Sequence, residues 1–186
     1  PVTTNSGSNT TWTAPASDGS YTITATAYDD NTKHTQETIT VVKAPTASLA
    51  ISPTGTIYSG NAFTLTPTYG NGTATLTYSG DSSGSLTCPS SGTATSAITA
   101  NWTAGVTRTY TLTVTNAAGT IATSSIAVTP QTPTPTITTT PSSCNIGGTY
   151  TIIGTHFTGT TTVTVGGVAA TYSVSNDSNI LITIPV

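Results

Sequence analysis

Charge is what the sequence most conspicuously lacks. Only 5% of the 186 residues are charged, against roughly a quarter in an ordinary globular chain. Three residues are basic, namely Lys33, Lys43 and Arg108. So few cations give neither the electrostatic footprint needed to bind nucleic acid nor a polybasic attraction to anionic lipid. The sequence therefore predicts no nucleic-acid partner.

Long apolar runs are missing as well. No run approaches the eighteen or so apolar residues that a membrane-spanning helix needs, so we expect no membrane insertion. The chain also does not open with a charged and then apolar leader segment. We expect either that a leader has been removed or that the chain is an excerpt of a longer protein.

Residues that carry chemistry are scarce. His34 and His156 lie far apart, neither has an acid and a nucleophile at a recognisable spacing, and no G-x-S-x-G elbow occurs. No Cys/His cluster has metal-ligand spacing. The sequence thus predicts no catalytic residue, no cofactor and no enzymatic activity. For Cys88 and Cys144 two interpretations stay open, namely two isolated thiols or an inter-domain or intermolecular disulfide in a secreted protein.

Threonine supplies about a quarter of the residues instead. It is β-branched, favours strands, and its hydroxyl keeps a solvent-facing strand position soluble without charge. Apolar residues alternate with Thr and Ser along short runs such as 21–27, 63–65 and 110–114, each bounded by Gly, Pro, Asn or Asp. This period of two is typical of strands, and no window has helical spacing. The sequence predicts an all-β fold.

An internal repeat indicates how the strands are organised. "NTTWTAPASDGSYTITATAYDDNTKHTQETITVV" parallels "ITANWTAGVTRTYTLTVTNAAGTIATSSIAVTP", which aligns Trp12 with Trp102 and Tyr21 with Tyr110. Each copy predicts a Trp-bearing strand, a turn, a long Tyr-led strand, a hairpin and a last strand. This is the back half of an immunoglobulin-like sandwich, in which the tyrosines would form a tyrosine corner. The equivalent positions favour core packing of both tryptophans over a role as sugar-stacking platforms.

The second copy has a front half that the first copy lacks. Its "SPTGTIYSGNAFTLT" resembles the opening of bacterial immunoglobulin-like surface repeats. We therefore interpret residues 44–130 as a complete sandwich and residues 1–43 as the back part of another.

A third module follows the Pro- and Thr-rich hinge "TPQTPTPT". Its motifs are Gly147-Gly148-Thr149, Gly154-Thr155-His156-Phe157, Val163-Thr164-Val165-Gly166-Gly167 and Ile180…Ile184-Pro185. On these motifs residues 131–186 resemble the IPT/TIG family of immunoglobulin-like domains, although the family usually has Asn where His156 stands and continues with strands that are missing here. The resemblance implies the fold and leaves the function open, because the family occurs in surface receptors, secreted enzymes and transcription factors.

The predicted fold class is therefore all-β, with tandem immunoglobulin-like β-sandwich modules over residues 1–43, 44–130 and 131–186, the first and last incomplete. Half a sandwich exposes its core face and open sheet edges. We expect strands from a neighbouring part of a longer polypeptide or from an adjacent copy to complete both ends. The predicted contact residues are Tyr21, Ile23, Ile39 and Val41 in the first module and Ile180, Ile182 and Ile184 in the last, with partners of the latter beyond Val186.

Two kinds of polar site are candidates. Asp18, Asp29 and Asp30 are weak calcium candidates, and the alternative is solvated turns, which Asp favours in any case. Asn9, Asn71, Asn101 and Asn176 fit the N-x-S/T glycosylation pattern, although some such triplets arise by chance in a Thr-rich chain.

The function predicted from these features is that of a non-catalytic structural protein of an extracellular or cell-surface appendage or filament, with strand complementation as one way to join subunits. Its partners would be copies of itself or neighbouring immunoglobulin-like modules, and glycans are a further candidate. The alternatives are a phage virion protein of the tail or capsid decoration and a carbohydrate-binding accessory module of a secreted enzyme.

Overall fold

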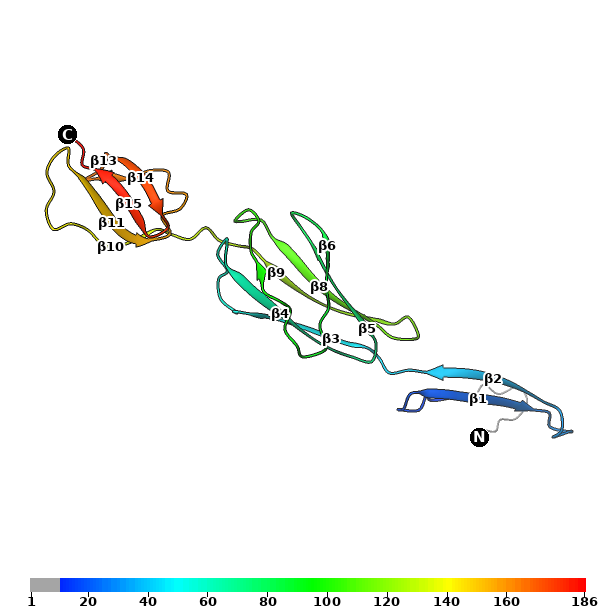
Figure 1. Cartoon of the computed structure of the whole chain (residues 1–186). Coiled ribbons are helices and arrows are strands. Elements are labelled where there is room, and N and C mark those ends of the chain that lie inside the picture. Colours follow the sequence, from blue (N-terminus) through cyan, green and yellow to red (C-terminus); the bar gives the residue numbers. More distant parts are fainter. Residues whose placement is uncertain (1–10) are drawn as a thin grey trace. The chain divides into compact units, whose positions relative to one another are not determined.

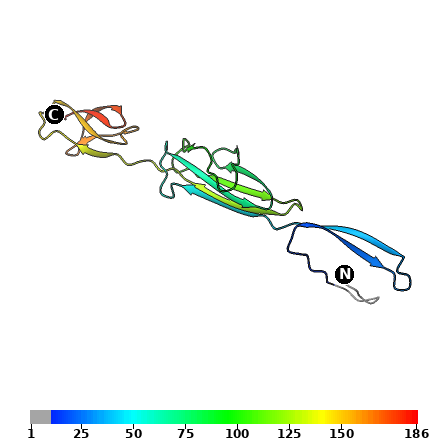
Figure 2. The same ribbon diagram turned by 60° about the horizontal axis from the view of Figure 1, so that its bottom comes forward.

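The computed structural model describes residues 11–186 and contains only β-strands as regular elements in that range (Figures 1 and 2). It consists of two compact units, one that ends at Pro130 and one formed by Gln131–Val186. No segment within the described range forms a helix long and apolar enough to cross a membrane. The predicted all-β, immunoglobulin-like fold class is confirmed.

The first part of the chain forms a two-stranded antiparallel hairpin of β1 (Gly19–Thr26) and β2 (His34–Val41). The turn between them is held by hydrogen bonds from Ala27 N to Lys33 O (2.9 Å) and from Lys33 N to Asp30 O (3.0 Å). Threonines alternate with apolar residues along β1, so one face of the hairpin is polar and the other carries the apolar side chains.

Residues 46–128 form a sandwich of two antiparallel sheets. One sheet has the order β3 (Thr46–Ser52), β4 (Ala62–Gly70) and β7 (Ile98–Thr99). The other has the order β6 (Gly84–Leu86), β5 (Thr73–Ser79), β8 (Arg108–Thr115) and β9 (Ile121–Val128). The inward-facing side chains of both sheets form one core, which is lined by Leu49, Ile57, Phe63, Leu65, Leu76, Ala100, Trp102, Tyr110, Leu112, Val114 and Val128.

The C-terminal unit has a four-stranded sheet in the order β10 (Thr136–Thr139), β11 (Thr149–Thr155), β15 (Asn179–Thr183) and β14 (Thr171–Asn176). A small hairpin of β12 (Thr164–Val165) and β13 (Val168–Ala169) accompanies it. Gly166 and Gly167 form its two-residue turn with φ values of 58° and 85°, which is the backbone that a type I′ turn requires.

The core of this unit includes side chains of its last strand, β15. Ile180 and Ile182 are buried, together with Ile152 and Phe157, and Ile184 packs against this cluster. These contacts come from within the unit because β15 lies between β11 and β14 in the sheet. Additional strands beyond Val186 that would contact Ile180, Ile182 and Ile184 remain a prediction.

Candidate module-contact site

The four predicted contact residues of the first module lie on one face of the hairpin. Tyr21 pairs with Ile39 and Gly19 with Val41 across the two strands, and residues directly opposite each other share a face. Ile23 lies on the same face opposite Glu37. Ile23 is 41% exposed, and Tyr21, Ile39 and Val41 are only half-buried. The apolar face is therefore formed but only partly covered.

The predicted tyrosine corner is present in this hairpin. The Tyr21 hydroxyl donates to the backbone carbonyl of Ser17 at 3.0 Å, so the ring is tied to the chain that enters β1. Trp12 packs against the Tyr21 ring with centroids 6.4 Å apart. Trp12 nevertheless remains 38% exposed, and the expectation that it is a core residue is wrong for this arrangement of residues 11–43.

The sandwich of residues 46–128, hereafter the complete module, contains a matching hairpin, β8–β9, whose apolar face is covered. β8 and β9 have the same lengths as β1 and β2, eight residues each. Their register is also the same, because Tyr110 pairs with Ile126 and Arg108 with Val128, as Tyr21 pairs with Ile39 and Gly19 with Val41. Here, however, Tyr110 is 1% exposed and Val128 is 3% exposed.

The sheet of β3 and β4 accounts for this difference. The Phe63 ring meets the Tyr110 ring edge-on at 5.7 Å and the Trp102 ring at 6.3 Å. Leu49 and Leu65 belong to the same core. A hydrogen bond also joins β3 to β9, in which the Leu49 backbone N–H donates to the Ser124 hydroxyl at 3.1 Å. A front-half sheet therefore supplies both the apolar surface and a hydrogen-bond donor to the β8–β9 hairpin.

An ion pair that the sequence reasoning missed closes one end of this core. The Arg108 guanidinium binds both carboxylate oxygens of Asp81 at 2.8 Å and lies over the rings of Trp102 (4.2 Å) and Tyr78 (4.8 Å). The hydrogen bonds to Arg108 lower the pKa of Asp81, and those to Asp81 raise the pKa of Arg108. The two residues are 27 positions apart in sequence, and no local sequence motif predicts their contact.

Tyr110 departs from the predicted tyrosine corner. Its buried hydroxyl makes no hydrogen bond to the backbone of the described residues, whereas the corner requires one. Burial raises the pKa of Tyr110, and the Arg108 charge acts in the opposite direction. The Trp102 indole instead makes the local backbone bond, from Nε1 to Val106 O at 2.9 Å.

The calcium candidates are not gathered into a site. Asp18 precedes β1, whereas Asp29 and Asp30 follow it, and a strand of eight residues spans about 26 Å. The Asp30 carboxylate accepts bonds from the hydroxyl (2.6 Å) and N–H (3.0 Å) of Thr32, which lower its pKa. Across residues 11–186 no three His, Cys, Asp or Glu residues converge as metal ligands.

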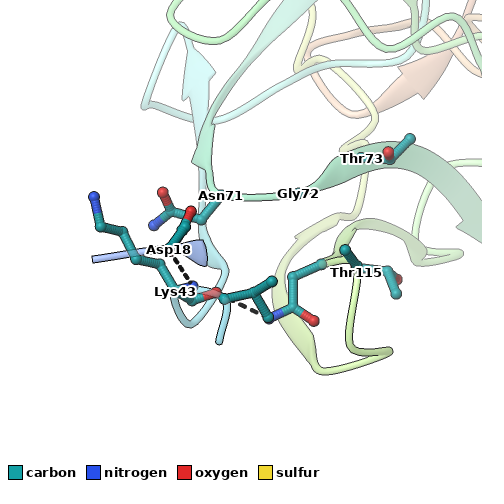
Figure 3. A pocket seen from close by; sticks show the side chains of 9 residues that line it. Asp18, Lys43, Asn71, Gly72, Thr73 and Thr115 are labelled. Atoms are coloured by element: carbon teal, nitrogen blue, oxygen red, sulfur yellow. Dashed lines mark hydrogen bonds between the residues drawn. The ribbon is translucent and has the colours of Figure 1, made fainter. Parts of the chain in front are cut away.

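Asp18 instead lines an open depression where residue 43 meets the loops of the complete module (Figure 3). Its carboxylate accepts the Lys43 N–H at 2.7 Å, and the buried Asn116 donates to Lys43 O at 2.9 Å. Asn71 has a left-handed φ of 58° and donates to Ala44 O at 3.0 Å. These bonds fix the backbone at residues 43 and 44, so we interpret the depression as a structural junction.

Three of the four glycosylation candidates can be placed. Asn71, Asn101 and Asn176 are exposed, whereas Asn9 lies outside the described residues. The Asn176 side-chain oxygen accepts bonds from Ser178 N and Asn179 Nδ2, and it therefore organises the β14–β15 turn. Glycosylation at all four positions stays a prediction.

The IPT/TIG-like motif around His156 now has a structural explanation. His156 has a φ of 59°, in the left-handed region where Asn is favoured, which suits the Asn usual in the family. Asp177 accepts the N–H groups of Thr158 (3.2 Å) and His156 (3.3 Å), and these bonds lower its pKa. A Cβ on Gly154 would collide with the Thr136 carbonyl and the Phe157 ring. The motif therefore serves packing.

The remaining reactive side chains are dispersed. His34 lies at the start of β2 and His156 in the C-terminal unit. Cys88 is half-buried and Cys144 exposed, both are free thiols, and they belong to different units. Burial raises the pKa of the Cys88 thiol.

Comparison with known proteins gives a family match within the C-terminal unit. The family model of the IPT/TIG domain matches residues 135–186. The predicted resemblance of this module is thereby confirmed. No curated protein matches the chain.

One solved structure that is similar to the chain is the Bacteroides ovatus mixed-linkage glucan utilization locus (MLGUL) SGBP-B in complex with mixed-linkage heptasaccharide. The two are 20% identical, with a TM-score of 0.31 over 77% of this chain and 40% of the other. The chain thus spans less than half the length of that protein.

Proposed function

We propose that this chain is a non-catalytic structural part of an extracellular or cell-surface appendage or filament, built from immunoglobulin-like modules in series. The open apolar face of the β1–β2 hairpin is the observation that carries the proposal. An exposed apolar face with open strand edges promotes aggregation of an isolated protein. In a chain of modules, a neighbouring module can cover the same face. Strand complementation between subunits is one form that such a contact would take.

The outward surface fits a protein in such an assembly. In the complete module, threonines of neighbouring strands face each other in rows, such as Thr75 with Thr113 and Thr77 with Thr111. These side chains are hydrated without being charged, so adjacent modules would not repel one another electrostatically. Ordinary soluble domains carry far more charge, with roughly a quarter of their residues charged.

Immunogold electron microscopy of the native source tests this proposal, with antibodies raised against residues 44–130. We expect label along filaments or fibres that extend from the cell surface. Label restricted to virions would favour the phage alternative instead. Label confined to the cell interior would contradict an extracellular function altogether.

A second candidate function is carbohydrate binding, and the exposure of Trp12 is the observation that favours it. An exposed indole beside the Tyr21 ring offers apolar surface to the flat face of a sugar, and a surface poor in charge suits neutral glycans. Titration with soluble neutral β-glucans, followed by tryptophan fluorescence, tests this candidate. Trp12→Ala should abolish binding, and Tyr28→Ala, which removes a 98% exposed ring at the hairpin tip, should not. Equal binding by the Trp12→Ala variant would reject it.

A further inference from the structure

The uncovered hairpin and the covered hairpin have the same register, so the complete module shows what the open face accepts. Position 21 corresponds to 110, position 23 to 112, and positions 39 and 41 to 126 and 128. In the complete module Leu112 is 0% exposed, whereas its counterpart Ile23 is 41% exposed. The difference between the two regions is the presence of β3 and β4 over the second hairpin.

We propose that the apolar face of β1–β2 is the docking site for the front-half sheet of another immunoglobulin-like module. The occupant is a pair of strands of the β3–β4 type, with an aromatic ring where β4 has Phe63 and aliphatic side chains where Leu49 and Leu65 stand. The chain's own β3 and β4 already cover β8–β9, so the occupant comes from outside residues 44–130. The inference deepens the proposed structural function, since it names the partner.

Glu37 supplies a hydrogen-bond acceptor on the proposed docking face. It lies opposite Ile23, where the complete module has Ser124 opposite Leu112. Ser124 accepts the backbone N–H of Leu49 from the covering sheet. A carboxylate at the same place is a stronger acceptor than a hydroxyl. Glu37 therefore accepts a backbone N–H of the docked strand.

The same residue argues against a second copy of the hairpin as the occupant. Two such hairpins packed face to face would enclose two Glu37 carboxylates between apolar side chains. The side chains on the face of β1 are Tyr21, Ile23 and Ala25, and none of them is cationic. Unpaired buried charge is costly. A backbone N–H from a docking strand gives Glu37 a hydrogen-bond partner without adding a second charge.

A fused chain tests the proposal, with a copy of residues 44–101 placed directly before Trp12 of residues 12–186. This order reproduces the passage from Asn101 to Trp102 in the repeat. Amide hydrogen exchange should slow by about a hundredfold or more in β1 and β2, because a closed module exchanges mainly through global opening. The matched control carries Phe63→Asp in the added copy only, and its β1 and β2 should exchange as fast as in the unfused chain.

Glu37 is tested in the same fused chain. Glu37→Gln keeps an acceptor and should retain the protection, whereas Glu37→Ala should lose part of it. Protection of β8 and β9 in every variant is the internal check that the chain has folded. Unchanged exchange in β1 and β2 of a fused chain with protected β8 and β9 would overturn the docking site. So would protection of β1 and β2 in an unfused chain that sediments as a dimer. Both results are independent of the immunogold labelling that tests the proposed function.

Discussion

The β1–β2 and β8–β9 hairpins share a sequence pattern and a register. Only β8–β9 is covered by a second sheet. Both pair a tyrosine with an isoleucine and keep threonines on the opposite face. Tyr110 and Leu112 lie in a core and are at most 1% exposed, whereas Ile23 is 41% exposed. The comparison teaches that alternation and turns are enough to specify a hairpin and its register. Burial depends on a second sheet that local sequence does not encode.

Hydrogen exchange on the unfused chain should show the largest contrast between the two hairpins. Two strands alone are marginal in water, whereas a domain unfolds at a cost of about 5–15 kcal/mol. The amides of β8 should therefore exchange about a thousandfold more slowly than those of β1, or slower still. Exchange measured by NMR at Leu112 and Ile23 checks this most directly. Similar rates at both positions would show that the first hairpin is already covered.

Truncation of the corresponding apolar side chains should have unequal effects. Leu112→Ala removes a fully buried side chain and should lower the free energy of unfolding of the complete module by about 2–5 kcal/mol. The matched Ile23→Ala change should cost less than about 0.5 kcal/mol in that same module, because it lies outside its core. Urea unfolding followed by Trp102 fluorescence, in a Trp12→Phe background, measures both. Equal losses would mean that the first hairpin contributes to the core of the complete module.

The C-terminal unit extends the comparison, because it has a core cluster of its own. Ile182 is 5% exposed and Leu181, its neighbour on the opposite face, is 40% exposed. Ile182→Ala should destabilise this unit by about 2 kcal/mol, at the lower end for a buried residue because the cluster is small. Leu181→Ala is the control and should have little effect. Thermal unfolding of residues 131–186, monitored by circular dichroism, measures both variants. Equal effects would contradict the placement of Ile182 in the core.

Sequence alone predicted the all-β fold, the IPT/TIG module and the repeat, because strand alternation and turn residues are local signals. It failed for Trp12, which is 38% exposed, because burial depends on which strands become neighbours. β15 lies between β11 and β14, and this placement could not be inferred from an isolated run of isoleucines. The equivalence of Glu37 with Ser124 was not foreseen either, because it depends on the registers of the two hairpins.

The last prediction uses the one position where the two hairpins differ most in chemistry. Arg108 begins β8, whereas its counterpart in β1 is Gly19. Arg108 holds the pKa of Asp81 below its ordinary value of 3.8. A carboxyl group with a depressed pKa stabilises the folded state at pH values above its unfolded pKa. That contribution is lost as the pH falls through the folded-state pKa, so the complete module should weaken below about pH 4.

Asp81 is the sole acidic residue between positions 44 and 130, which makes this effect unusually easy to isolate. Urea unfolding reported by Trp102 in the Trp12→Phe background should give a constant stability from pH 7 to about pH 4.5 and a decline below it. Asp81→Asn should lower the stability at pH 7, by less than Leu112→Ala does, and should flatten the profile at low pH. The β1–β2 hairpin, with glycine at the corresponding position, has no such pair to lose. A decline that persists in the Asp81→Asn variant would assign the acid sensitivity to something other than the Arg108 contact.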